Sequence, residues 1–274
     1  MRLLILLLLL STMSFAVPPR VAGQVSGDTI LAVFAHPDDE FTVAPVLARY
    51  AREGAVVYLA IATDGSRGVQ PHAGIPPGAP LAKARADEAR CAAEVLGIQP
   101  PILFGLEDGG LAEWDNLVGH CETPECEPGR LSGEILRLFH ELRPDAVITW
   151  GPDGGYGHAD HRLISAVTTE VFQEGGEGWP VNLYYVGIPA SRISDAPDWP
   201  GPPLLGVEQQ LLTVQVPYAD EHAEIAERAL QCHGSQFTAE GMAATASIFR
   251  HVNQGRIYFR PFVHTTSTTL FASP

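Results

Sequence analysis

Residues 29–40 read TILAVFAHPDDE, an apolar run that gives way at once to an imidazole and three acids. The first seven letters are apolar and rich in β-branched residues, which is typical of a buried strand. Because the polar letters follow directly, His36 and the acids from Asp38 to Glu40 are expected at the carboxyl end of that strand. The stretch therefore predicts the first strand of a sheet and a polar site on the turn after it.

Strands alternate with helices along the rest of the chain. Apolar runs predict further strands over residues 55–62, 102–104, 146–150, 183–186 and 211–216. Apolar residues at helical spacing predict helices over residues 40–52, 81–96, 131–142, 158–172 and 218–232. We expect residues 257–263 to add an edge strand. This alternation predicts a Rossmann-like α/β fold, a single domain with a mainly parallel sheet and helices on both faces.

A second polar cluster, HADH at residues 158–161, follows the predicted fourth strand. In such a sheet the ligand crevice lies outside the carboxyl ends of the strands, where the loops after the first and fourth strands converge. His158 and His161 are three positions apart and share one helix face. Together the two clusters offer three metal ligands and an open position, which is the plan of a catalytic zinc site. The helix macrodipole alone would explain acids at a helix start, but it does not explain His36 ahead of them.

The two clusters resemble the signatures of the PIG-L or LmbE-like zinc deacetylases, a family that includes the mycothiol-pathway deacetylases. HPDDE, from His36 to Glu40, is the leading family signature in full. HADH is similar to the later family motif HPDH, with Ala159 in place of the proline. The resemblance runs from about residue 30 to about residue 237 and implies a deacetylase domain over residues 28–265.

Three further segments bear on this resemblance. Arg85 and Glu88 are similar to the family's Arg-x-x-Glu helix, and HGSQ from His233 resembles its His-x-Ser-Gln. The chain departs from the family at Ser66, where a glutamate is common. The substrate contacts that the resemblance implies are Arg85, Asp108 and His233.

The resemblance also implies a cofactor, Zn2+, and the residues that hold it. His36, Asp39 and His161 become the zinc ligands, and Asp38 becomes the general base. Simple chemistry agrees, because zinc lowers the pKa of its water toward about 7 and a nearby carboxylate can take the remaining proton.

An amide carbonyl under attack develops a negative oxygen that needs positive charge or hydrogen-bond donors. We expect the metal to supply charge from one side and His158, kept protonated by Asp160, to supply it from another. Tyr156 lies on a glycine-flanked loop two residues earlier and is expected to cover that oxygen or gate the pocket.

Composition narrows the class of protein and of partner. Apolar residues make up 46% of the 274 residues and charged residues only 18%, so the chain has ample material for a core. The formal net charge of −15 would repel phosphate backbones, which excludes nucleic acid as a partner. A small-molecule or glycoconjugate substrate is expected instead.

The first sixteen residues predict export. One arginine, a leucine-rich run and the small-residue ending SFA, residues 14–16, together describe a secretory signal peptide cleaved after Ala16. The alternative, an uncleaved anchor, needs roughly twenty apolar residues, and this run is shorter. We therefore expect a secreted or periplasmic protein, with no membrane span in the mature chain.

Four cysteines in an exported chain are compatible with two disulfides. Cys121 and Cys126 bracket a short acidic turn and are expected to be bonded. Cys91 and Cys232 each lie on a predicted helix, so a second bridge and two buried free thiols both remain open.

These observations favour an exported zinc hydrolase that removes an acetyl group from an N-acetylated amino sugar or glycoconjugate. One alternative is a zinc amidase that acts on a larger acyl amide. Another is a carbohydrate-binding protein that uses its metal only for structure, and a third is an acidic scaffold for cations. A free carboxylate at Asp38, beside the ligands, argues against the binding protein, because a closed structural site does not need it.

Overall fold

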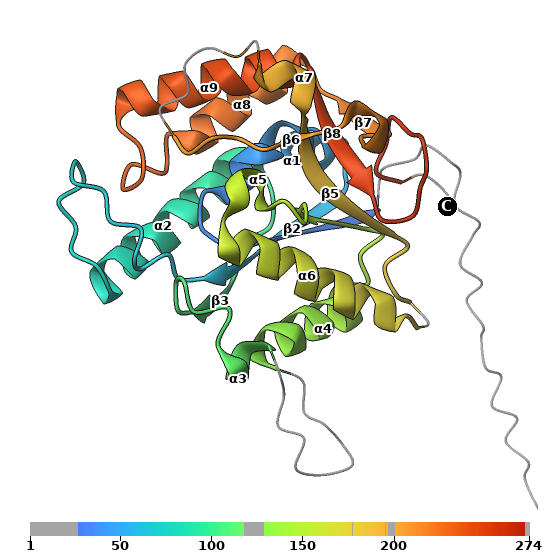
Figure 1. Cartoon of the computed structure of the whole chain (residues 1–274), viewed down its shortest axis with the longest axis horizontal. Helices are drawn as coiled ribbons and strands as arrows, with labels where there is room; N and C mark the ends of the chain where they lie inside the picture. Colours follow the sequence, from blue (N-terminus) through green and yellow to red (C-terminus); the bar gives the residue numbers. More distant parts are fainter. Residues whose placement is uncertain (1–26, 118–128, 177, 195, 197–200, 272–274) are drawn as a thin grey trace, which may run out of the picture.

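The computed structural model describes residues 27–117, 129–176, 178–194, 196 and 201–271 (Figure 1). Its strands are β1 (Thr29–Phe34), β2 (Val56–Thr63), β3 (Ile102–Leu106), β4 (Ala146–Trp150), β5 (Asn182–Pro189), β6 (Gly206–Val207), β7 (Val214–Pro217) and β8 (Arg256–Pro261). Its α-helices are α1 (Ala44–Arg52), α2 (Ala79–Leu96), α3 (Trp114–Leu117), α4 (Arg130–Leu142), α5 (Gly154–Gly157), α6 (Ala159–Glu174), α7 (Ala190–Ile193), α8 (Asp220–Leu230) and α9 (Ala239–Asn253). Short 3-10 helices cover Asp39–Thr42 and Gln209–Leu211.

The strands form one mixed sheet in the order β3-β2-β1-β4-β5-β8-β7, with β6 paired to the end of β5. The pairs from β3 through β5 are parallel, whereas β8 runs antiparallel to both β5 and β7. From β1 the chain moves outward through β2 to β3 and then returns to β4 on the other side of β1. The strand order therefore reverses between β1 and β4, and the crevice of a doubly wound sheet lies at this point.

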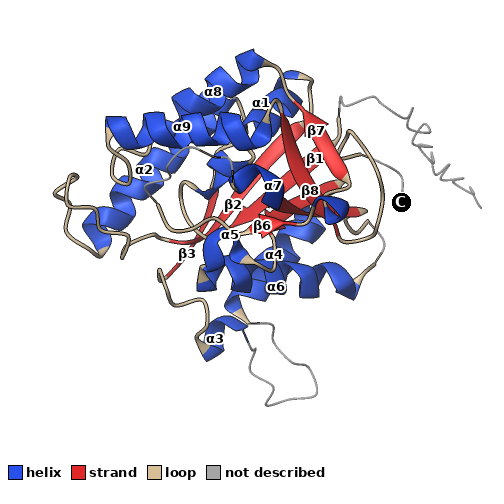
Figure 2. Ribbon diagram, turned by 45° about the horizontal axis from the view of Figure 1, so that its top comes forward, coloured by secondary structure: helices blue, strands red, loops and turns tan. Residues whose placement is uncertain are grey.

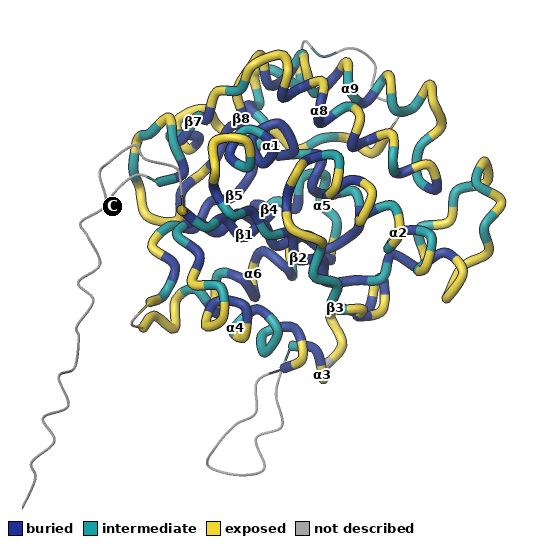
Figure 3. Tube along the Cα trace, turned by 180° about the vertical axis from the view of Figure 1, so that it is seen from behind, coloured by how far each residue is buried: buried dark blue, intermediate teal, exposed yellow. Residues whose placement is uncertain are grey.

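Helices cover both faces of the sheet, as the Rossmann-like α/β prediction requires. Figure 2 shows α4 and α6 on one face and α1, α2, α8 and α9 on the other. The middle strands are the most buried part of the molecule, drawn dark blue in Figure 3. In β1 every residue from Ile30 to Phe34 is fully buried, because both faces of a parallel strand lie against helices.

The C-terminal third differs from the sequence-based prediction. The strand at residues 256–261 is not an edge strand: it lies between β5 and β7, and Ile257, Tyr258 and Phe259 are buried there. The strand expected from residue 211 begins only at Val214. Helix α9 was not predicted at all. It begins after Thr238, whose side-chain oxygen accepts a hydrogen bond from the backbone N–H of Gly241.

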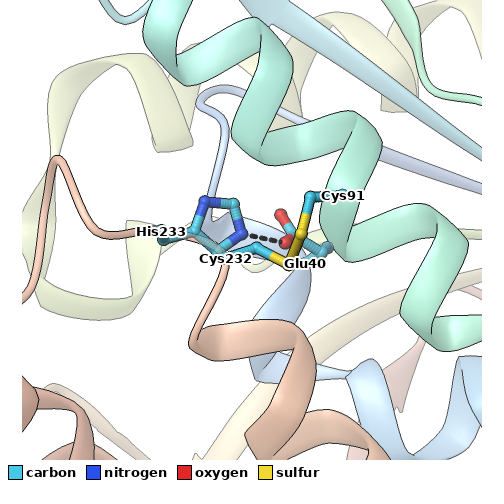
Figure 4. The surroundings of a disulfide bond; sticks show 4 residues. All are labelled: Glu40, Cys91, Cys232 and His233. Carbon is cyan, nitrogen blue, oxygen red and sulfur yellow. Dashed lines mark hydrogen bonds and ion pairs between the residues drawn. A yellow bond between two sulfur atoms is a disulfide. The ribbon is translucent and has the colours of Figure 1, made fainter.

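Cys91 of α2 and Cys232, just after α8, form a disulfide bond (Figure 4). This settles the choice between a bridge and two free thiols. Cys121 and Cys126 lie outside the described residues, so their bond stays a prediction, and so does the signal peptide over residues 1–16. Among the helices that the structure describes, none combines the length and the hydropathy that a bilayer crossing requires.

Candidate active site

The turn after β1 holds Asp39 through one carboxylate oxygen, Oδ2, and leaves the other, Oδ1, facing the crevice. Asp39 Oδ2 accepts hydrogen bonds from the backbone N–H groups of Ala35 (3.0 Å) and His36 (2.9 Å) and from Trp150 Nε1 (2.9 Å). Asp39 Oδ1 lies 3.1 Å from Nε2 of His161, which comes from α6 on the far side of the crevice. Burial raises the pKa of Asp39, but the charge and hydrogen bond of His161 outweigh it and hold that pKa well below its usual range.

The two histidines are oriented by the partners of their other ring nitrogens. His161 Nδ1 lies 3.1 Å from the carbonyl oxygen of Gly154, which can only accept, so Nδ1 donates there and Nε2 is the nitrogen that faces Asp39 and His36. His36 Nε2 lies 3.2 Å from a carboxylate oxygen of Asp160 and 3.4 Å from one of Asp108. His36 Nδ1 then points at His161 Nε2, 3.1 Å away, and lies 3.7 Å from Asp39 Oδ2.

These orientations fit a metal ion held by His36, Asp39 and His161. Two ring nitrogens and a carboxylate oxygen converge on one place, and each group is locked by an outer hydrogen bond in the way that metal ligands usually are. Burial lowers the pKa of His36, but hydrogen bonds to Asp108 and Asp160 and the charge of Asp39 raise it to about 10. The carboxylates thus favour a positive charge here, whether a proton or a metal ion supplies it.

His158 lies beside these ligands, but its contacts do not favour the protonated form that the sequence predicted. Nitrogens of His36, His158 and His161 lie within 4.8 Å of one another. His158 caps α6: its Nδ1 accepts a hydrogen bond from the backbone N–H of Asp160 (3.2 Å). The Asp160 carboxylate instead contacts His36 and accepts from the backbone N–H of Gly109 (3.0 Å).

The prediction that Asp160 keeps His158 protonated is therefore wrong. Burial, followed by the charges of His36 and His161, lowers the pKa of His158. A neutral ring whose Nδ1 accepts carries its hydrogen on Nε2, so His158 serves as a neutral donor.

Asp38 is held in an unusual conformation at the edge of the site. Its φ of 106° lies in the left-handed region, which non-glycine residues seldom adopt. The backbone N–H of Asp38 donates to Glu40 Oε2 (3.0 Å), and Arg85 Nη2 lies 3.2 Å from Asp38 Oδ2. Burial raises the pKa of Asp38; the Arg85 charge opposes this shift, and the Asp39 charge adds to it.

Arg85 and His233, two of the expected substrate contacts, hold the turn that carries Asp38 and Glu40. Arg85 is only 3% exposed and donates to the carbonyl oxygens of Gly65 (3.1 Å) and Pro37 besides its pair with Asp38. Gly65, at φ +64°, is required there, because a Cβ would lie 2.5 Å from Arg85 Nη1. His233 is fully buried, and its Nε2 lies 2.6 Å from the carboxylate of Glu40 (Figure 4). Both side chains are engaged within the protein, and a contact of either one with substrate stays a prediction.

Asp108 contacts a histidine of the site, and Tyr156 lines the cavity beside it. Asp108 is buried, and its two oxygens face His36 Nε2 and the backbone N–H of Arg67 (2.9 Å). It therefore orients His36, and its contact with substrate stays a prediction. Tyr156 is half-buried with its ring 5.1 Å from that of His161. Burial, reinforced by the charges of Asp39 and Asp38, holds the pKa of Tyr156 well above its usual range, so its hydroxyl keeps its proton.

A cavity of about 420 Å³ opens beside these groups. Asp38, Asp39, Trp150 and Tyr156 line it. Helix α9 contributes Gly241, Thr245 and Phe249 to the lining, and none of these was singled out from the sequence. The signal that was available is weak: Thr238 is a good N-cap, but Gly241 stands in the first turn of the helix that follows, and glycine disfavours a helix.

Comparisons with known proteins agree with this geometry. The sequence model of the family described as PIG-L: GlcNAc-PI de-N-acetylase matches residues 31–172, a segment that contains both polar clusters. A deacetylase from Rhodococcus opacus, named 1D-myo-inositol 2-acetamido-2-deoxy-alpha-D-glucopyranoside deacetylase, is 34% identical over 195 residues, which cover 62% of this chain and 67% of that protein.

A second relative and a solved structure extend the comparison. Mycothiol S-conjugate amidase from Streptomyces coelicolor is 31% identical over 250 residues, with 77% of this chain and 83% of that protein covered. The solved structure of N,N'-diacetylchitobiose deacetylase from Pyrococcus horikoshii superposes with a TM-score of 0.62 at 17% identity, covering 87% of this chain and 86% of that one. At that identity the superposition supports the fold alone.

Proposed function

The chain belongs to the PIG-L family, and from that premise we propose that it is a zinc-dependent hydrolase that removes an acetyl group from an N-acetylated amino sugar or glycoconjugate. One observation carries the proposal. Three potential ligand atoms lie together beside the carboxylate of Asp38, whose pKa burial raises: His161 Nε2 is 3.1 Å from both His36 Nδ1 and Asp39 Oδ1. Ligands with a proton acceptor next to them are what amide hydrolysis by a metal-activated water requires.

His36, Asp39 and His161 are the residues that would hold the zinc. Zinc bound there would supply a water of lowered pKa and a positive charge for the amide carbonyl oxygen. Asp108, Asp160 and the Gly154 carbonyl keep the two histidines turned toward the ion.

Asp38 moves the proton. The reaction consumes a water and an amide and yields acetate and an amine, so one proton must pass from the water oxygen to the amide nitrogen. A carboxylate whose pKa is raised accepts that proton more readily than an ordinary one and later returns it to the departing amine. Arg85 and Glu40 hold Asp38 in place for both transfers.

The amide carbonyl oxygen gains negative charge as the water attacks. The Nε2–H of His158 and the hydroxyl of Tyr156 are donors close to the ligand His161, whose ring lies 4.8 Å from that of His158 and 5.1 Å from that of Tyr156, and both keep their hydrogen at neutral pH. Because these donors are already in position, no free energy is spent on reorienting them as the charge develops. We therefore assign His158 and Tyr156 as hydrogen-bond donors to the amide carbonyl oxygen.

The proposal is tested by amine release from a panel of N-acetylglucosamine conjugates. Zinc-loaded protein is expected to release amine and acetate in equal amounts, whereas metal-depleted protein is expected to release neither. The matching N-hexanoyl sugars test for the amidase, an alternative that the Streptomyces relative favours. Binding of the conjugates without hydrolysis would overturn the proposal and support the metal-stabilised binding protein.

We further propose that the protein is exported to an oxidising compartment, with residues 1–16 as the signal. The Cys91–Cys232 disulfide supports this, because such bonds persist mainly outside the reducing cytosol. The secreted chain is expected to start near Val17 when its N-terminus is sequenced. A start at Met1 on exported protein would contradict the signal peptide.

A further inference from the structure

The cavity beside the ligands has a polar and a mainly apolar part of its lining. The polar part carries the carboxylates of the turn after β1, the indole of Trp150 and the phenol of Tyr156. The rest includes polar side chains such as Gln70, Gln236 and Asn253 but is mainly aliphatic and aromatic, formed by Val186, Ile188, Leu205, Phe237 and Phe249. These come from β5, from the segment before β6, and from α9 with the turn before it, and α9 packs against β5 and α7 (Figure 2).

The apolar part of the cavity is joined directly to the catalytic turn. The ring of Phe249 lies 4.6 Å from that of Phe41, which follows Glu40 in the 3-10 helix after β1. A substrate whose amide lies at Asp38 therefore extends toward α9 without leaving the cavity. This wall lies outside residues 31–172, the segment that the family model matches, so family membership does not fix what the wall binds.

Carbon-lined walls discriminate against polyols. A sugar or inositol hydroxyl placed against Ile188 or Phe249 would lose hydrogen bonds to water and gain none from these side chains, which costs free energy. An alkyl or aryl group placed there instead removes apolar surface from water on both sides of the contact. Leu205 is still 39% exposed in this structure, so apolar surface remains for a ligand to cover.

We propose that this part of the cavity, defined by Val186, Ile188, Leu205, Phe237 and Phe249, binds an apolar aglycone of the N-acetylated sugar. The inference rests on the proposed function, because removal of an acetyl group leaves the aglycone as the part of the substrate that can be large and apolar. The apolar cavity then selects alkyl or aryl glycosides over glycosides of polyols such as inositol.

The test compares hexyl with methyl β-glycosides of N-acetylglucosamine on the zinc-loaded protein. A buried methylene is worth about a three- to fourfold gain in binding, so the hexyl glycoside is expected to have a kcat/KM at least about tenfold higher. A ratio near one overturns the proposal. A gain seen only when the N-acetyl group is lengthened to N-hexanoyl also overturns it, because the acyl chain would then occupy the cavity.

Gly241 offers a variant that fills the cavity. A Cβ at this position would meet only Thr238 Oγ1, at 3.4 Å, and Phe237 Cβ, at 4.0 Å, so the helix accepts a side chain there. Gly241→Leu is expected to lower the hexyl-to-methyl ratio at least threefold. A folding defect would instead lower both rates together. Ala243→Leu, on the exposed side of the same helix, is the matched control and should leave the ratio unchanged.

Calorimetric binding of the two glycosides separates this inference from the proposed function. If no conjugate releases amine, the proposed function fails. Tighter binding of the hexyl glycoside, weakened by Gly241→Leu, would still support an apolar ligand site. Equal binding of the two glycosides would overturn it.

Discussion

Replacement of Asp38 by asparagine is expected to lower kcat by about 10²–10⁴-fold while the zinc content stays at the parent value. Asparagine keeps the size of the side chain and also tolerates the positive φ of this residue, so the turn is retained. It cannot accept the proton of the attacking water. Amine release at saturating substrate measures kcat, and mass spectrometry measures the zinc content of the same variant.

The control for this variant is Asp87→Asn, the same chemical change at an exposed residue of α2. It should leave turnover and metal content unchanged. Unchanged turnover in Asp38→Asn would remove Asp38 from the role of general base. A loss of zinc in that variant would place Asp38 among the ligands instead.

Replacement of His161 by alanine is expected to abolish metal binding and turnover together. The side chain is fully buried, and its Nε2 lies 3.1 Å from both Asp39 Oδ1 and His36 Nδ1. Alanine offers no ligand atom at this position. Loss of an outer-shell partner alone costs about 10–100-fold in metal affinity, and loss of a ligand should exceed that. Metal content after dialysis against a weak chelator is the measurement.

His264→Ala, at an exposed position, is the matched control and should retain both metal and activity. Full zinc occupancy in His161→Ala would show that the ion is held elsewhere, for example by His36, Asp108 and Asp160, whose ligand atoms also lie within 4.8 Å of one another. That result would contradict the ligand set proposed above.

The first half of the fold was predictable because its signals are local. The run before His36 is apolar and β-branched, and the polar letters follow it without a gap, so a buried strand and a polar turn could both be predicted. The α/β alternation then placed the HADH cluster, residues 158–161, across the crevice from that turn. The structure brings the two together as the strand order implies.

The roles of the residues around the ligands depend on contacts between distant parts of the chain, which a sequence pattern does not contain. His233 and Glu40 are 193 positions apart, and Arg85 meets Asp38 from a different helix, so only the folded chain shows that both are buried and hold the turn after β1. The protonation state of His158 depends on a backbone N–H of α6 rather than on the acid beside it in the sequence. Helix α9 lacked a clear apolar stripe, so the apolar part of the cavity was missed with it.

A zinc titration of the metal-depleted protein tests the central claim most directly, that one ion held by His36, Asp39 and His161 drives amide hydrolysis. Amine release from an N-acetylglucosamine glycoside is followed as zinc is added in steps below one equivalent. The rate is expected to rise in proportion to the zinc added and to level off at about one equivalent per chain, because His36, Asp39 and His161 together hold one ion. Full activity before any metal is added, or no activity at one equivalent of bound zinc, would contradict the account.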